Sequence, residues 1–84
     1  ILHQNYPNPF NPKTQINFSL ARDQHVNLEI FDINGRSIVK LIDKPMQVGE
    51  YRIGFDASRL SSGVYLYKLT TQSFTETKKM LLIK

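Results

Sequence analysis

Hydrophobic and polar residues alternate along most of this chain with a repeat of two. Residues 14–20 show the repeat most clearly, with Ile16, Phe18 and Leu20 on one face and polar side chains on the other. Every second residue of a strand points to the same face of a sheet, so the pattern predicts a half-buried β-strand. No window shows a helical period, and the fold class is therefore predicted to be all-β.

Further strands are predicted by the same pattern. They are expected over residues 26–33, 36–42, 51–56, 64–71 and 74–83. Asn34-Gly35 predicts a hairpin with a type I′ turn, because both residues tolerate positive φ. Residues 43–49 are expected to form a loop, with Pro45 marking an edge. The alternation over residues 36–42 is blurred and leaves the register there open.

A sheet-to-sheet crossover is indicated by residues 56–69, DASRLSSGVYLYKL. Leu60 is expected to pack under the crossover and Gly63 to adopt a backbone angle that other residues resist. Tyr65 is expected to reach back to a carbonyl just upstream, as the tyrosine corner of β-sandwiches does, and Tyr67 to replace the core cysteine of immunoglobulin domains. Together with the strand spacing, these features predict a small immunoglobulin-like antiparallel β-sandwich of six or seven strands.

The first residues have the prolines of a linker but also carry aromatic rings. Residues 4–12 read QNYPNPFNP and include Tyr6 and Phe10. Burying one such ring contributes a few kcal/mol, enough to hold a segment against a sheet edge. We therefore predict one domain, with residues 1–13 as an ordered N-terminal strap and residues 14–84 as the sandwich.

Size and charge exclude several classes of protein. The 84 residues suffice for one domain, and the absence of cysteine rules out disulfides and thiolate metal sites. The net charge of +4 is scattered, and only Lys78, Lys79 and Lys84 form a group in the sequence. A nucleic-acid footprint concentrates its charge on one face, so nucleic-acid binding is not expected. No apolar run approaches the ~20 residues of a membrane span, and no signal peptide is recognisable.

No pattern of residues predicts catalysis. Asp32-x-Asn34-Gly35 has the opening of a calcium loop, but Arg36 stands where a further oxygen ligand is needed. The two histidines have no partner at metal-ligand spacing, and the serines before Gly63 lack a nucleophile elbow. We therefore expect no enzyme activity, no metal site and no cofactor.

Carbohydrate binding is an alternative that the tyrosines leave open. Tyr6, Tyr51, Tyr65 and Tyr67 could together offer a stacking platform for sugars, as in accessory modules of extracellular enzymes. Against this, Tyr65 and Tyr67 are expected at the corner and in the core, and tryptophan is absent.

Three segments carry a resemblance to a known family. QNYPNPFNPKTQINFSL, VNLEIFDINGRSIVKLI and FDASRLSSGVYLYKL with the closing TETKKMLLIK resemble the type A C-terminal sorting domain of the type IX (Por) secretion system of Bacteroidetes-like bacteria. The resemblance extends from Asn5 to Lys84. It implies an immunoglobulin-like module that export machinery recognises in the periplasm, so that an upstream cargo crosses the outer membrane. A sortase-like cysteine protease commonly removes such a domain, and the cargo is released or attached to the cell surface.

The resemblance also implies roles for particular residues. The opening motif comprises Asn5, Pro7, Asn8, Pro9, Phe10, Asn11 and Pro12. The corner motif comprises Leu60, Gly63 and Tyr65, and both motifs are expected to be mainly structural. Partner recognition is expected at Lys78, Lys79, Met80, Leu82 and Lys84. An exposed last strand with unpaired edge groups and flanking lysines would dock on the secretion components by strand addition plus charge.

Two neighbouring families have similar modules. Flagellar hook-capping proteins carry a related immunoglobulin-like module, and many secreted glycoside hydrolases end in β-sandwiches of structural or sugar-binding character. A sorting domain closes its parent chain, whereas an accessory module need not. The position of Lys84 directly after the terminal motif favours the sorting domain.

Overall fold

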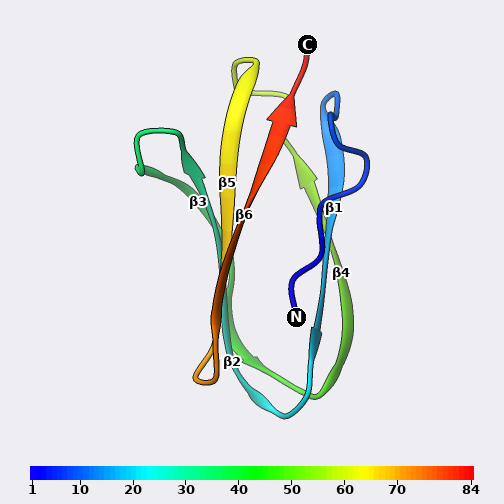
Figure 1. Ribbon diagram of the computed structural model, residues 1–84, viewed down its shortest axis with the longest axis vertical. Helices are drawn as coiled ribbons and strands as arrows, with labels where there is room; N and C mark the ends of the chain where they lie inside the picture. Colours follow the sequence, from blue (N-terminus) through cyan, green and yellow to red (C-terminus); the bar gives the residue numbers. More distant parts are fainter.

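Six β-strands form two antiparallel sheets in the computed structural model, which describes residues 1–84 (Figure 1). The strands are β1 (Lys13–Leu20), β2 (Gln24–Asp32), β3 (Ser37–Met46), β4 (Gly49–Asp56), β5 (Gly63–Thr70) and β6 (Thr75–Leu82). β1 pairs with β4 in a two-stranded sheet, and the other sheet has the order β3-β2-β5-β6. The predictions of an all-β fold and of a small β-sandwich are confirmed. None of the segments forms a helix long and apolar enough to cross a membrane.

The core lies between the two sheets and includes the alternating apolar row predicted for residues 14–20, together with Leu2, Phe10 and Ala57 from outside the strands. Ile16, Phe18 and Leu20 of β1 are at most 3% exposed. Across the core, the four-stranded sheet contributes its own inward rows. These include Val26, Leu28, Ile30, Tyr67, Leu69, Met80 and Leu82, each at most 1% exposed. Removal of this apolar surface from water is the main force that holds the sheets together.

The β2–β3 hairpin forms as predicted, but its turn is of a different type. The N–H of Gly35 donates to the carbonyl of Asp32 at 3.0 Å, and the N–H of Asp32 donates to the carbonyl of Arg36 at 2.9 Å. Only Gly35 has a positive φ, of 86°, so the predicted type I′ turn is wrong. The loop has three residues and ends in a left-handed glycine. The Asp32 carboxylate favours this form, because its Oδ1 accepts the N–H groups of Asn34 and Arg36, each at 2.9 Å.

The predicted loop at residues 43–49 is also wrong, because β3 continues to Met46. Lys44 lies opposite Val26, and Pro45 lies opposite His25. Proline is tolerated here because β3 is the edge strand of its sheet, as the sequence predicted. Two register shifts in the β2–β3 pairing account for the blurred alternation of this segment.

The corner between β4 and β5 agrees with its prediction. The hydroxyl of Tyr65 donates to the carbonyl of Ser61 at 2.6 Å. Gly63 has a φ of 153°, a conformation that L-residues with a side chain rarely adopt. Leu60 packs against the core, and Tyr67 is fully buried.

Candidate functional site

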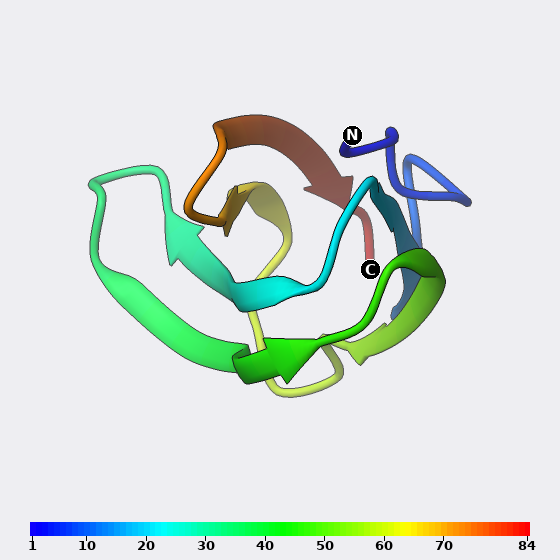
Figure 2. The same ribbon diagram turned by 90° about the horizontal axis from the view of Figure 1, so that it is seen from below.

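The opening motif joins the two sheets along one side of the sandwich. Residues 1–6 run antiparallel to β1, and the N–H groups of His3 and Tyr6 donate to the carbonyls of Asn17 and Gln15, both at 3.0 Å. The chain then crosses to β6, where Phe10 forms a parallel bridge with Leu82. Figure 2 shows this N-terminal strap passing between β1 and β6. The strap therefore closes the gap between the edge strands of both sheets.

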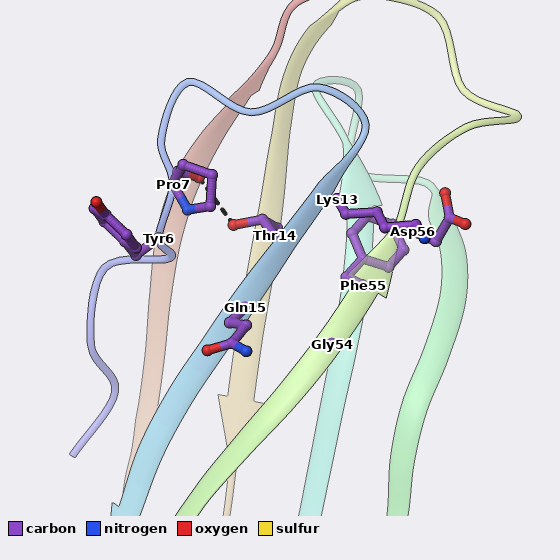
Figure 3. Close-up of a pocket in the computed structure, with 8 residues that line it drawn as sticks. All are labelled: Tyr6, Pro7, Lys13, Thr14, Gln15, Gly54, Phe55 and Asp56. Carbon is purple, nitrogen blue, oxygen red and sulfur yellow. Dashed lines mark hydrogen bonds between the residues drawn. The ribbon is translucent and has the colours of Figure 1, made fainter.

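A buried polar cluster anchors the strap in the core. The Tyr67 hydroxyl accepts a hydrogen bond from the N–H of Asn5 at 2.8 Å and donates one to the carbonyl of His3 at 2.9 Å. The Asn5 side-chain amide donates to the Thr14 hydroxyl at 3.0 Å. This hydroxyl in turn donates to the carbonyl of Pro7 at 2.9 Å, the bond drawn in Figure 3. Asn5 is 2% exposed and Thr14 is 4% exposed. Burial raises the pKa of Tyr67 to about 12, so its hydroxyl stays protonated and can donate.

Asn8 and Phe10 occupy the outer edge of β6. Asn8 Oδ1 accepts the N–H of Leu81 at 2.9 Å, and the N–H of Phe10 donates to the Leu81 carbonyl at 2.9 Å. The N–H of Ile83 donates to the Phe10 carbonyl at 3.0 Å, while the Phe10 ring is 2% exposed. Further along, the Gln4 side chain donates to the Lys79 carbonyl at 2.7 Å. The expectation that the last strand presents unpaired edge groups is therefore wrong from Lys79 to Ile83, where the strap occupies that edge.

The other residues of the opening motif lie nearer the surface. Pro7 contributes its carbonyl to the polar cluster, and the carbonyl of Pro12 accepts the N–H of Ala57 at 2.9 Å. Pro9 and Asn11 are exposed in the loop between these anchors. The motif thus alternates residues that bond the strap to the sheets with residues that turn the chain.

The terminal motif does not place its side chains on one surface. Met80 is 1% exposed and Leu82 is fully buried, so both pack in the core. Lys78 shares their inward row at the periphery and is half-buried, whereas Lys79 points outward and is exposed. Lys84 Nζ donates to the carbonyl of Ser58 at 2.6 Å, beside the corner. The three lysines that are grouped in the sequence are therefore directed to different sides of the fold.

The four tyrosines do not form a common platform. Tyr65 and Tyr67 are buried, and the Tyr51 ring stacks on Phe18 with 5.3 Å between ring centroids. Only Tyr6 is widely accessible, at 77% exposed, and Figure 3 shows its ring pointing away from β1. A shallow hollow beside it is lined in part by Gln15 and Gly54. One exposed ring over a shallow hollow does not make the flat row of rings that the sugar-binding alternative required.

The titratable groups make local contacts in turns and hairpins. His25 Nε2 lies 2.6 Å from Asp43 Oδ1, and this hydrogen bond lowers the pKa of the Asp43 carboxyl. The N–H of Ser58 bonds to Asp56 Oδ1 at 2.9 Å and lowers the pKa of Asp56. No group of three or more histidine, cysteine and acidic side chains lies close enough to hold a metal ion.

Sequence reasoning missed the partners of the two motifs. The Thr14 hydroxyl completes the buried cluster with Asn5. Glu76 Oε1 accepts the N–H of Leu2 at 3.1 Å and so joins β6 to the start of the strap. The polar residue at the buried position two before Ile16 was the available signal for Thr14. Nothing local in the sequence indicates Glu76.

Comparison with known proteins assigns the chain to a family. No curated protein matches it, but the model of the secretion system C-terminal sorting domain family matches residues 4–84. The match includes the strap from Gln4 onward, the corner and β6, which are joined by the hydrogen bonds described above. Domains of this family are non-catalytic and serve as export signals of the type IX (Por) secretion system, for cargo that is secreted or reaches the outer membrane. From Gln4 to Lys84, this chain belongs to the secretion system C-terminal sorting domain family.

Proposed function

We propose that the type IX machinery recognises this chain as a folded domain rather than as a linear tail. The observation that carries the proposal is the bond between Asn8 Oδ1 and the N–H of Leu81, which are 73 residues apart in the chain. It ties the opening motif directly to the terminal motif. The two motifs therefore depend on each other for their position, and only the folded chain presents both.

The finer steps of export complete this proposal. An upstream cargo in the same chain reaches the periplasm, and secretion components then bind this domain through its terminal motif. Lys78, Lys79 and Lys84 supply charge for binding, while the buried side chains of Met80 and Leu82 hold the strand in position. A sortase-like protease removes the domain after passage across the outer membrane, and the cargo is released or attached to the surface.

A reporter fusion tests the proposal. These residues are fused to the C-terminus of a fluorescent protein that carries a signal peptide, and the fusion is expressed with an intact type IX system or without its outer-membrane channel. We expect reporter at the surface or in the medium only in the intact strain, with the domain cleaved off. Reporter that stays in the periplasm of both strains would contradict the proposal.

Charge reversal tests the part played by the lysines. Lys79→Glu combined with Lys84→Glu is expected to abolish export of the fusion while the domain remains folded. Arg22→Glu combined with Arg52→Glu is the control, because it makes the same change in charge at exposed positions outside β6. Normal export of the double lysine variant would show that these charges are dispensable.

A further inference from the structure

The outer face of the four-stranded sheet is apolar at the end near the corner. Val64 and Leu66 of β5 point away from the core, because their neighbours Tyr65 and Tyr67 point into it. Both are only half-buried. An antiparallel sheet with one face on the core usually presents polar residues to water on the other. The apolar residues here depart from that rule.

Strand register brings further apolar residues beside these two. Leu81 of β6 lies opposite Val64, and Phe31 of β2 lies opposite Leu66. Leu81 is 37% exposed, and Ile83, which follows β6, is 50% exposed. We name Phe31, Val64, Leu66 and Leu81 the outer apolar patch. A contiguous apolar surface of this kind on a small domain usually marks an interaction site.

Lysines border the outer apolar patch. Lys79 lies opposite Leu66 and is exposed, and Lys68 Nζ lies 5.2 Å from the centroid of the Phe31 ring. Neither lysine belongs to an ion pair. Glu29 lies opposite Lys68 on the same face and keeps its charge while it accepts the Ser37 hydroxyl, so Lys68 is partly compensated. Lys79 lies opposite the apolar Leu66, and it therefore gives the border of the patch its positive charge.

Strand addition at the outer edge of β6 is blocked from Lys79 to Ile83 in this fold. That edge is hydrogen-bonded by Asn8 and Phe10 and partly covered by Gln4. β3, at the opposite edge of the sheet, carries Lys40, Lys44 and Pro45, which are features that discourage strand addition. The accessible part of this sheet is its outer face.

We propose that the outer apolar patch, with Lys68 and Lys79 at its border, is the surface by which a component of the export machinery binds this domain. The partner presents apolar side chains flanked by aspartate or glutamate, which match the patch and its lysines. This inference rests on the proposed function and adds the surface and the chemistry of the partner. It assigns recognition to the outward side chains Lys79 and Leu81 instead of the buried Met80 and Leu82.

The export fusion again provides the test, with three variants of the patch. Leu66→Thr and Leu81→Thr replace apolar area by β-branched residues that suit a strand, and Lys79→Glu reverses the charge. The control is Arg52→Glu, which makes the same charge change on the outward row of β4. We expect about a tenfold or greater loss of exported reporter for each patch variant and less than about a twofold change for the control. Urea unfolding of each purified variant confirms that the domain is folded, and Lys79→Gln gives a milder change if Lys79→Glu does not fold.

The outcomes separate the two proposals. If the unchanged fusion is not exported, the proposed function fails. If the unchanged fusion is exported and the folded patch variants are exported equally well, the proposed function stands and only the assignment of the outer apolar patch as the binding surface is overturned. A second copy of this domain is the other possible occupant of the outer apolar patch, and sedimentation of the purified domain tests for it. A dimer that dissociates in the Leu66→Thr variant would mean that the patch binds a second copy, and this too would overturn the proposal.

Discussion

The hydroxyl of Tyr67 and the backbone N–H of Asn5, 62 residues apart in the chain, form a buried hydrogen bond of 2.8 Å. The same hydroxyl donates to the carbonyl of His3. A core tyrosine thereby satisfies two backbone groups of the N-terminal strap. Tyr67 occupies the position of the core cysteine of immunoglobulin domains. In this domain the residue at that position binds the N-terminal strap.

Removal of this hydroxyl is expected to destabilise the domain. Tyr67→Phe keeps the ring but leaves the N–H of Asn5 and the carbonyl of His3 without a partner in a buried place. The expected loss in the free energy of unfolding is about 1–3 kcal/mol, measured by urea denaturation. Tyr51→Phe is the matched control, because its hydroxyl bonds to the Gln47 carbonyl in an exposed position. An equal loss in both variants would contradict a special role for the buried cluster.

High pH is expected to weaken the fold through the same residue. The pKa of Tyr67 is 10.0 in the absence of its surroundings and about 12 in the folded domain. As the pH rises, the unfolded chain therefore loses this proton before the folded domain does. The contribution of the Tyr67 hydroxyl to the free energy of unfolding is complete below pH 10 and is lost as the pH rises through 12. The loss amounts to at most about 3 kcal/mol. Urea denaturation at about pH 9 and about pH 11.5 measures the free energy of unfolding at both values. This free energy should fall more for the natural sequence than for Tyr67→Phe, and equal falls would show that Tyr67 is not the group responsible.

Substitution by alanine is expected to change the stability of the domain in opposite directions at two glycines. Gly63 has a φ of 153°, and although a Cβ there would meet nothing within 4 Å, its backbone conformation opposes a side chain. Gly63→Ala should cost roughly 1–3 kcal/mol of unfolding free energy. Gly54 has open space and an ordinary strand conformation. Gly54→Ala should therefore be neutral or add about 0.5–1 kcal/mol. Similar melting temperatures for the two variants would contradict this difference.

Loss of the Asn8 side chain should loosen the edge of β6 locally. In Asn8→Ala the N–H of Leu81 loses its acceptor, whereas Phe10 keeps its bonds to Leu81 and Ile83. We expect amide hydrogen exchange at Leu81 to become about tenfold faster, with little change at Ile83. Asn11→Ala, at an exposed neighbouring position of the motif, is the control. Unchanged exchange at Leu81 would show that Asn8 is not what protects this edge.

Local pattern was sufficient for the corner and for every strand except the second half of β3. The alternation around Phe18 and the spacing of Gly63 and Tyr65 report short-range geometry, which a sequence carries directly. The predicted type of the turn at Asn34 was wrong because the prediction considered the backbone preferences of Asn34 and Gly35 and not the Asp32 side chain, whose hydrogen bonds to the N–H groups of Asn34 and Arg36 favour the three-residue loop. The extension of β3 through Pro45 was missed because proline forbids a central strand but not an edge.

The candidate site was less predictable because it depends on pairing between the two ends of the chain. The sequence marked the residues of both motifs but could not show that Asn8 and Leu81 meet. It also could not show that strand alternation separates Lys78 from Lys79. A group of lysines in sequence is a group in space only if the local structure turns them the same way.

The strap also determines how the domain responds to mechanical force. A tether attached before residue 1 pulls first on the bonds of Ile1 to Ser19 and of His3 to Asn17. Because these antiparallel bonds follow one another along the strap, they open in turn, as in peeling, and the buried bond between Asn5 and Tyr67 comes next. Leu2 and Gln4 also bond to β6, through Glu76 Oε1 and the carbonyl of Lys79. A load on the N-terminal end is therefore divided between β1 and β6 from the start, whereas the bonds at Leu81 are protected until the buried bond between Asn5 and Tyr67 has opened.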